Sequence, residues 1–198
     1  MSAVLKQAQN MALATRSAEF QRVIGSIEAT DIEGARRESE QAIANLIALL
    51  EELRARGGRL YVVGNGGSAG IASHAVTDFL NVGKLKAGTL HDPALLTCMS
   101  NDYGYEAALA RILATLASPG DILIAISSSG QSANIRNAAA QIRRSRGMAI
   151  TLSGFKRDNP LRSLGDVNFW LDSNDYGMVE IGHQFILHNV ADRLRLGA

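Results

Sequence analysis

Hydrophobic residues along the first third of the chain recur with the spacing of helices. Residues 16–25 form a short candidate helix, and residues 33–56 form a longer one. The apolar positions of the longer segment are Ala42, Ile43, Leu46, Ile47, Leu50 and Leu53. They return every three or four positions, which is the period of an amphipathic helix, and Gly57 ends the pattern as glycine commonly does. The stripe predicts core contact within one subunit or an oligomer interface, and both readings stay open.

Beyond residue 58 short, solid apolar runs alternate with helical patterns. The expected strands are 60–63, 93–99, 121–126, 148–152 and 167–171, and the expected helices are 71–80, 105–117, 134–146 and 176–195. Solid apolar strands separated by helices indicate a mainly parallel sheet covered on both faces. We therefore predict an α/β fold, a three-layer sandwich, in one domain spanning 1–198. It would have a helical N-terminal extension (1–57) ahead of an α/β core (58–198).

Composition excludes several classes of protein. The chain has 198 residues, is 46% hydrophobic and carries a net charge of +1, which is too apolar for a disordered chain and too neutral for bulk binding of nucleic acid. No apolar run is long enough for a membrane span. A single cysteine, Cys98, excludes an internal disulfide and cysteine-based zinc motifs. The N-terminal residues lack the pattern of a signal peptide. We expect a cytoplasmic globular protein without nucleic-acid or membrane partners.

Two loops at the ends of predicted strands share one chemistry. Gly64–Ala69 is rich in glycine, and Ser127–Ser132 is rich in serine; neither contains Lys or Arg. In open parallel sheets ligands bind beyond the carboxyl ends of the strands. A helix N-terminus offers free N–H groups that hold an anion without a formal cation, and hydroxyls add neutral donors. The loops predict a site for a phosphate monoester of a polyol, although serines also serve as turn and cap residues.

A nucleotide cofactor fits less well. Gly64–Ala69 matches the G-x-G-x-x-A dinucleotide fingerprint, but that fingerprint needs a carboxylate about 20 residues further on, at the end of the next strand. The acidic residue after the next apolar run, Asp102, comes well beyond that distance. The P-loop motif is absent as well. We expect no nucleotide cofactor.

The polar segment 101–104 follows another apolar run, and its sequence is interpreted equally well as a turn or as a ligand contact.

Histidines and carboxylates are spaced to share helix faces. His74 and Asp78 are four residues apart on the helix that leaves the glycine loop, and Glu180 and His188 lie on the last helix. Such sets can be structural pairs, a metal site or a general acid–base pair. Their position downstream of a phosphate loop favours the last reading for His74 and Asp78. His91 is interpreted as a surface loop residue, and Cys98 as a buried small hydrophobe.

Three motifs together resemble a known family. They are Gly64–Ala69, Asn101–Gly104 and Ile126–Asn134, in the order and spacing of the sugar isomerase (SIS) domain, and the branch they resemble most is phosphoheptose isomerase. The resemblance implies a flavodoxin-like sheet and a homotetramer whose N-terminal helices pack across subunits. It also implies aldose–ketose isomerisation of a sugar phosphate, with sedoheptulose 7-phosphate as the expected substrate, in lipopolysaccharide or capsule biosynthesis.

The resemblance also implies roles for individual residues. The phosphate ligands of the family fall on Ser127, Ser128, Ser129 and Ser132. The sugar-binding positions fall on Asn65, Gly66, Ser68, Asp102 and Glu180. The catalytic base and the catalytic histidine fall on Asp78 and His188, and the zinc ligands on His74, Asp78, Glu180 and His188. Zinc is therefore the candidate cofactor.

The chain departs from the family pattern in its catalytic set. Asp78 is one methylene shorter than the family's glutamate, Glu180 replaces a glutamine, and Val82 replaces an arginine. A second carboxylate raises the proton affinity of its neighbours. The phosphate loop is thus better preserved than the catalytic residues. Two hypotheses remain: an isomerase acting on a sugar phosphate, or a non-catalytic phosphosugar-binding or regulatory protein that acts through protein partners.

Overall fold

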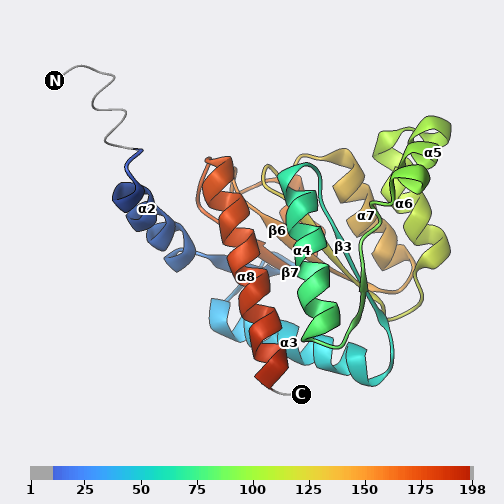
Figure 1. Cartoon of the computed structure of the whole chain (residues 1–198), viewed down its shortest axis with the longest axis horizontal. Coiled ribbons are helices and arrows are strands. Elements are labelled where there is room, and N and C mark those ends of the chain that lie inside the picture. The colour runs from blue at the N-terminus through green and yellow to red at the C-terminus, as the bar shows by residue number, and fades with distance from the viewer. Residues whose placement is uncertain (1–10, 197–198) are drawn as a thin grey trace.

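A seven-stranded sheet lies between two layers of helices (Figure 1). The computed structural model of the chain describes residues 11–196, so the first ten residues of the expected N-terminal extension lie outside the described range. The three-layer α/β architecture with a mostly parallel sheet is confirmed. None of the helices in the described range combines the length and hydropathy needed to cross a membrane.

Five of the seven strands, from β7 at one side through β6, β5 and β3 to β4, form the parallel part of the sheet. The strands are β1 (Glu28–Asp31), β2 (Arg36–Arg37), β3 (Arg59–Val63), β4 (Lys86–Gly88), β5 (Ile122–Ser127), β6 (Met148–Ser153) and β7 (Val167–Trp170). Their spatial order is β2-β1-β7-β6-β5-β3-β4. Strand β1 runs antiparallel to both of its neighbours, β2 and β7. Strands β3 and β5 are adjacent and parallel, so the segments that follow them emerge at the same edge.

Helices cover both faces of the sheet. They are α2 (Leu13–Gly25), α3 (Ser39–Ala55), α4 (Gly67–Asn81), α5 (Pro93–Tyr103), α6 (Tyr105–Leu116), α7 (Ala133–Arg144) and α8 (Tyr176–Leu196), with a 3₁₀ turn at Pro160–Ser163. Figure 1 shows α3, α4 and α8 on one face and α5, α6 and α7 on the other. Helix α2 extends beyond the sheet and contacts α8 through an edge-to-face pair of Phe20 and Phe185.

The central strands β3 and β5 are nearly solid apolar runs because both of their faces are buried. In β3, Leu60 and Val62 belong to the core beneath α4 and α8, whereas Tyr61 and Val63 belong to the core beneath α6 and α7. Alternate side chains of a strand point to opposite faces, so a central strand that is covered on both sides needs hydrophobic residues at every position.

The N-terminal extension is less helical than predicted. The expected helix over 33–56 starts only at Ser39, and two of the residues before it, Arg36 and Arg37, form β2. The carboxylate of Glu38 accepts hydrogen bonds from the backbone N–H groups of Glu40 and Gln41, which is the role of an N-cap residue. The segment also supplies β1, which pairs with β7. Part of the predicted extension thus completes the edge of the sheet.

The strand predicted over residues 93–99 is wrong. The segment forms α5, because Pro93 occupies the first turn and the side chain of Asp92 accepts a hydrogen bond from Leu95 N. Proline is favoured at the start of a helix, and this cap outweighs the apolar run. The edge of the sheet beside β3 is formed instead by the short strand β4. Cys98 lies on α5 and is exposed, contrary to its interpretation as a buried residue.

Candidate active site

The glycine loop and the serine loop meet at one edge of the sheet. The first joins β3 to α4, and the second joins β5 to α7. Between them lies a cavity of about 280 Å³. Its lining residues are Asn65, Gly66, Gly67, Ser68, Ile126, Ser127, Ser128, Ser129, Ser132, Tyr176 and Glu180. The structure therefore brings together most of the residues that the sequence assigned to substrate binding.

A reciprocal pair of amides joins the two loops. Asn65 Nδ2 donates to Asn134 Oδ1 at 2.9 Å, and Asn134 Nδ2 donates to Asn65 Oδ1 at 2.9 Å. The hydroxyl of Tyr105 also donates to Asn65 Oδ1, at 2.8 Å. Because Asn134 is buried, 3% exposed, these hydrogen bonds are shielded from water and fix the spacing of the loops.

Neutral donors dominate the serine loop. Ser127 Oγ donates to Ser132 Oγ at 3.3 Å, while Ser128 Oγ is buried and has no hydrogen-bond partner in the described part of the chain. Gly130 has φ +65, and a Cβ at that position would overlap Asn159, so only glycine fits this turn. No Lys or Arg of the described range lines the cavity. An anion here would be held by hydroxyls and backbone N–H groups.

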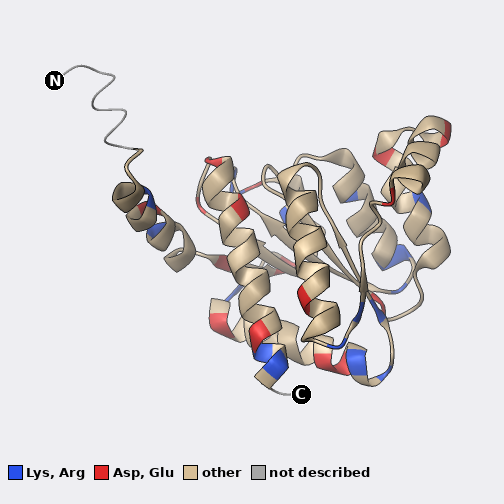
Figure 2. Cartoon of the chain, in the orientation of Figure 1, with Lys and Arg blue, Asp and Glu red and all other residues tan. Residues whose placement is uncertain are grey.

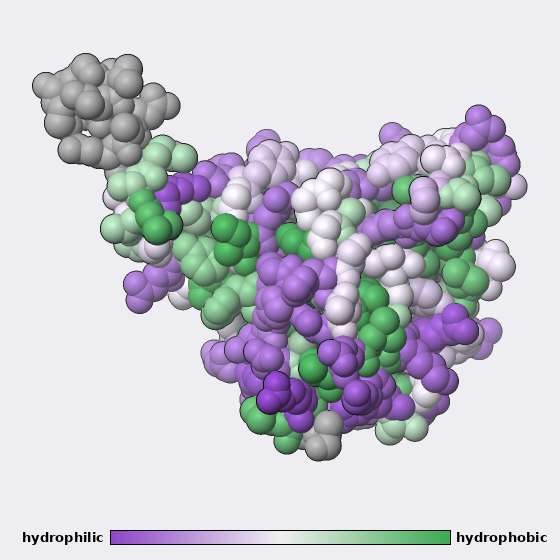
Figure 3. Space-filling model, viewed as in Figure 1, coloured by the Kyte–Doolittle hydropathy of each residue, from purple (hydrophilic) through white to green (hydrophobic). Residues whose placement is uncertain are grey.

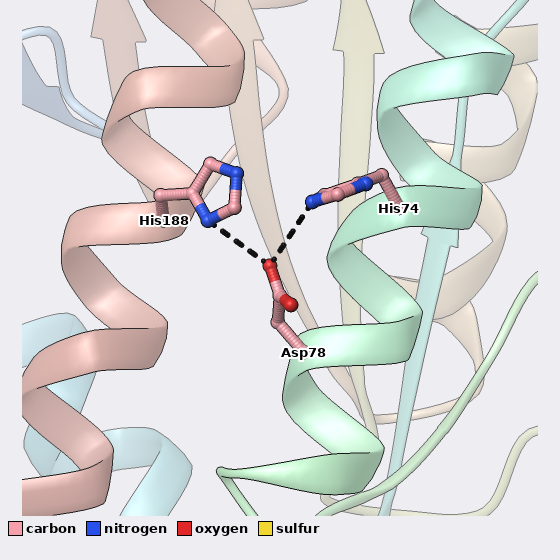
Figure 4. A group of neighbouring side chains, drawn as sticks. All are labelled: His74, Asp78 and His188. Atoms are coloured by element: carbon pink, nitrogen blue, oxygen red, sulfur yellow. Dashed lines mark ion pairs between the residues drawn. The ribbon is translucent and has the colours of Figure 1, made fainter.

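A cluster of ionisable side chains lies further along α4 and α8 (Figure 4). His188 Nδ1 is 3.1 Å from Asp78 Oδ2, and His74 Nε2 is 3.5 Å from the same oxygen. The two imidazole rings meet edge to face, with centroids 4.8 Å apart. Asp78 is the only Lys, Arg, Asp or Glu residue on α4 (Figure 2). The side chains of His74 and His188 are 54% and 45% exposed, so small molecules can reach them.

The cluster fits a zinc ion. One ligand atom from each of His74, Asp78 and His188 lies within 4.8 Å of the others. Asp78 Oδ2 is buried and, among the residues that the structure describes, makes no hydrogen bond of good geometry, although both histidines lie near it. Imidazole nitrogens and a carboxylate oxygen are ligands that zinc prefers, and three protein ligands leave a coordination position for a substrate. These three residues would hold the ion.

Glu180 does not join this group. Its carboxylate lies against Gly67 at the start of α4, where a Cβ would come 2.6 Å from Glu180 Cδ. It lines the cavity between the loops instead. Of the four predicted zinc ligands, the structure therefore groups three and directs the fourth to the substrate cavity.

Two other residues depart from their sequence interpretations. Asp102 is exposed on α5, contacts Asn101 and Cys98, and does not line the cavity, so its part in sugar binding stays a prediction. His91 is not a simple surface residue. It is half-buried, its Nε2 accepts a hydrogen bond from Gly64 N at 3.5 Å, and burial lowers the pKa of its imidazole.

Sequence reasoning missed three residues of this site. Asn134 closes the motif Ile126–Asn134 but was given no role of its own, although its place in the first turn of α7 beside a ligand loop was a usable signal. Tyr105 and Tyr176 begin helices α6 and α8. Nothing in their sequence context indicates that they approach Asn65 and the cavity, because that proximity depends on how the helices pack.

The fold and the loops can be compared with known proteins. A family model described as the SIS domain matches residues 27–153. The chain belongs to the SIS domain family. A phosphoheptose isomerase of Pelobacter propionicus is 36% identical to this SIS protein over 163 residues, covering 79% of this chain and 85% of the relative.

Solved structures agree with the assignment to the SIS domain family. The phosphoheptose isomerase from Francisella tularensis superposes with a TM-score of 0.82 at 25% identity, covering 99% of this chain and 100% of the other. That from Neisseria gonorrhoeae gives a TM-score of 0.78 at 25% identity, covering 92% and 96%. The resemblance stated from the sequence motifs is confirmed.

Proposed function

We propose that this SIS protein isomerises a sugar phosphate between its ketose and aldose forms, converting sedoheptulose 7-phosphate to a heptose 7-phosphate. One observation carries the proposal. Helices α4 and α8 contribute residues both to the cavity beside the serine loop and to the cluster of His74, Asp78 and His188. The similarity in sequence and structure to proteins named phosphoheptose isomerase supports it.

The serine loop would hold the phosphate. Ser128 Oγ is buried and finds no hydrogen-bond partner within residues 11–196, and Ser127, Ser129 and Ser132 line the same cavity. The N-terminus of α7, which follows the loop, favours negative charge. Asn65, Gly66 and Ser68, on the opposite wall, would contact the hydroxyls of the sugar.

The histidine cluster would act at the reactive end. Isomerisation moves one proton between C1 and C2 and rearranges protons on the two oxygens, which needs a carboxylate base and groups that exchange protons at oxygen. His74 and His188 are exposed imidazoles that can exchange protons at oxygen while no metal ion is bound to them. Zinc, when bound, would polarise the carbonyl oxygen. Asp78 and Glu180 are the two carboxylates available for the first task.

Exposed apolar side chains on α2 and α8 support a homotetramer. Leu13, Ile181 and Phe185 are 83%, 57% and 50% exposed. Figure 3 shows hydrophobic side chains gathered over α2 and the neighbouring surface. Apolar patches of this kind mark interaction sites, and packing of the N-terminal helices across subunits would cover them.

We further propose that the protein acts in the cytoplasm and supplies heptose for the synthesis of lipopolysaccharide or capsule.

A turnover assay tests the proposal. Sedoheptulose 7-phosphate is incubated with the protein, with and without zinc, and the aldose product is followed by proton NMR. We expect product with the phosphorylated sugar and none with sedoheptulose. A Ser128→Ala variant should raise KM at least about tenfold, because a buried hydrogen bond to a charged group is lost. Tight binding without turnover would instead favour a non-catalytic phosphosugar-binding protein.

A further inference from the structure

We propose that Glu180, rather than Asp78, is the base that moves the proton between C1 and C2 of the sugar phosphate. The inference rests on the proposed function and assigns the proton-transfer step within it. Both carboxylates project from the paired helices α4 and α8, but only Glu180 borders the cavity.

The surroundings of Asp78 do not suit a base. A general base must come within hydrogen-bond reach of the proton that it removes, and Asp78 is absent from the cavity lining. Its Oδ2 atom is buried and faces both His188 Nδ1 and His74 Nε2. Imidazoles, and a metal ion when bound, would engage that oxygen. Asp78 is placed to orient the histidines and to ligate the ion, and its short side chain is sufficient for both.

The surroundings of Glu180 leave its carboxylate available. Among the described residues that line the cavity, Glu180 is the only one with a carboxylate. Within the described residues it makes no hydrogen bond or ion pair. The first residue of α4, Gly67, lies directly beneath it. Since the N-terminus of a helix carries partial positive charge, a negatively charged side chain is favoured at that place.

The glycine contact also fixes where the carboxylate stands. A Cβ on Gly67 would overlap the Glu180 carboxyl group. The Glu180 side chain can therefore lie this close to the glycine loop only because residue 67 has no side chain. The carboxylate therefore lies between the wall that contacts the sugar and the start of α4. A sugar phosphate that fills the cavity must touch it.

The reaction starts from the open-chain ketose. Glu180 takes the proton from C1, the C–H electron pair becomes the C1=C2 bond of an enediol, and the C2 carbonyl oxygen takes a proton from a water molecule. The hydroxyl on C1 then returns a proton to the resulting hydroxide as its oxygen forms the aldehyde. The carboxyl proton of Glu180 exchanges with solvent at the enediol stage, and Glu180 then delivers a proton to C2. No oxidant or reductant is consumed, and Glu180 and the water molecule return to their starting states.

Four proteins test the assignment: wild type, Glu180→Gln, Asp78→Asn and the exposed control Glu52→Gln on α3. Each is incubated with sedoheptulose 7-phosphate in D₂O, with turnover and deuterium entry at C1 followed by NMR. Binding of the sugar phosphate and of zinc is measured by calorimetry. We expect Glu180→Gln to lose turnover and exchange by about 100-fold or more, the size of a general-base contribution, with both affinities retained. Asp78→Asn should lose zinc affinity, and Glu52→Gln should match wild type.

Chemical rescue separates a base from a structural residue. Glu180→Ala removes the carboxylate, and added formate should restore part of the turnover because a small carboxylate can occupy the vacated space. Three results would overturn the assignment. The first is turnover of Glu180→Gln within tenfold of wild type, and the second is a loss of zinc affinity in Glu180→Gln equal to that of Asp78→Asn. The third is the absence of rescue of Glu180→Ala by formate. Wild-type protein without turnover or exchange would overturn the proposed function itself, and the assignment with it.

Discussion

Asn65 and Asn134 exchange two hydrogen bonds of 2.9 Å, one in each direction, and so tie the glycine loop to the serine loop. The pair is neutral and self-satisfied, and it spans the two strand ends that form the cavity. Asn134 is not among the cavity-lining residues, so its contribution to ligand binding would act through the spacing of the loops.

The first prediction concerns Asn134. Replacement with Ala leaves Asn65 Nδ2 without its acceptor, while Tyr105 still donates to Asn65 Oδ1. We expect the free energy of unfolding to fall by about 1–3 kcal/mol, the cost of a buried polar group that loses its hydrogen bond. KM for the sugar phosphate should rise as well. Urea denaturation and steady-state kinetics measure the two effects. Asn137→Ala, on the exposed side of α7, serves as the control; equal effects from the two variants would contradict the role given to the pair.

The second prediction concerns Gly67 and Gly70, both on α4. A Cβ at Gly67 would overlap the Glu180 carboxylate, whereas a Cβ at Gly70 would meet no atom of the described residues within 4 Å. We expect Gly67→Ala to lose most turnover. Gly70→Ala should raise the free energy of unfolding by about 0.5–1 kcal/mol, since alanine is the better helix former. Kinetics and thermal unfolding of the two variants check this contrast. Full activity of Gly67→Ala would show that turnover does not require the Glu180 carboxylate to lie against residue 67.

The third prediction concerns acid stability. His183 is fully buried, its Nε2 lies 3.2 Å from Ser153 O, and burial lowers the pKa of its imidazole to about 4. The unfolded chain binds the proton near pH 6.5. Between these values the unfolded state holds more protons, so stability present above pH 6.5 is lost as the pH falls towards 4, by up to about 3 kcal/mol.

Chemical denaturation from pH 7 to pH 4 measures that loss. His183→Gln, whose amide can still donate to Ser153 O, should have a lower free energy of unfolding at pH 7 and a flatter dependence on pH. An unchanged slope in the variant would show that other groups carry the acid sensitivity.

The fourth prediction concerns zinc. A metal that binds only the folded state stabilises it, by about 2.7 kcal/mol at a free concentration one hundred times Kd. We expect zinc to raise Tm of the wild-type protein and a chelator to reverse the effect. His188→Gln and Asp78→Asn should abolish the increase. Asp102→Asn, which changes an exposed carboxylate outside the cluster, should keep it. An equal increase in all four proteins would indicate binding elsewhere.

Much of this architecture could be predicted from local sequence. The solid apolar runs of β3, β5, β6 and β7 identify strands buried on both faces, and the glycine and serine loops follow two of them directly. The strand wrongly predicted over 93–99 shows the limit of that reasoning, because the helix signal lay in Asp92 and Pro93 rather than in the apolar run.

The arrangement of the site was harder to predict. His74 and Asp78 share a helix, so their proximity follows from spacing, and His188 joins them because α8 packs along α4. The direction of Glu180 could not be inferred in this way. It depends on close contact with Gly67, which is distant in sequence and which leaves space for the carboxylate because glycine has no Cβ.

The central claim is that this SIS protein isomerises a sugar phosphate through an enediol. The most direct measurement is NMR of the product formed from sedoheptulose 7-phosphate by zinc-loaded wild-type protein in D₂O. We predict an aldose heptose 7-phosphate that carries solvent deuterium at C2. Binding of the sugar phosphate with neither product nor deuterium in the recovered substrate would contradict the claim.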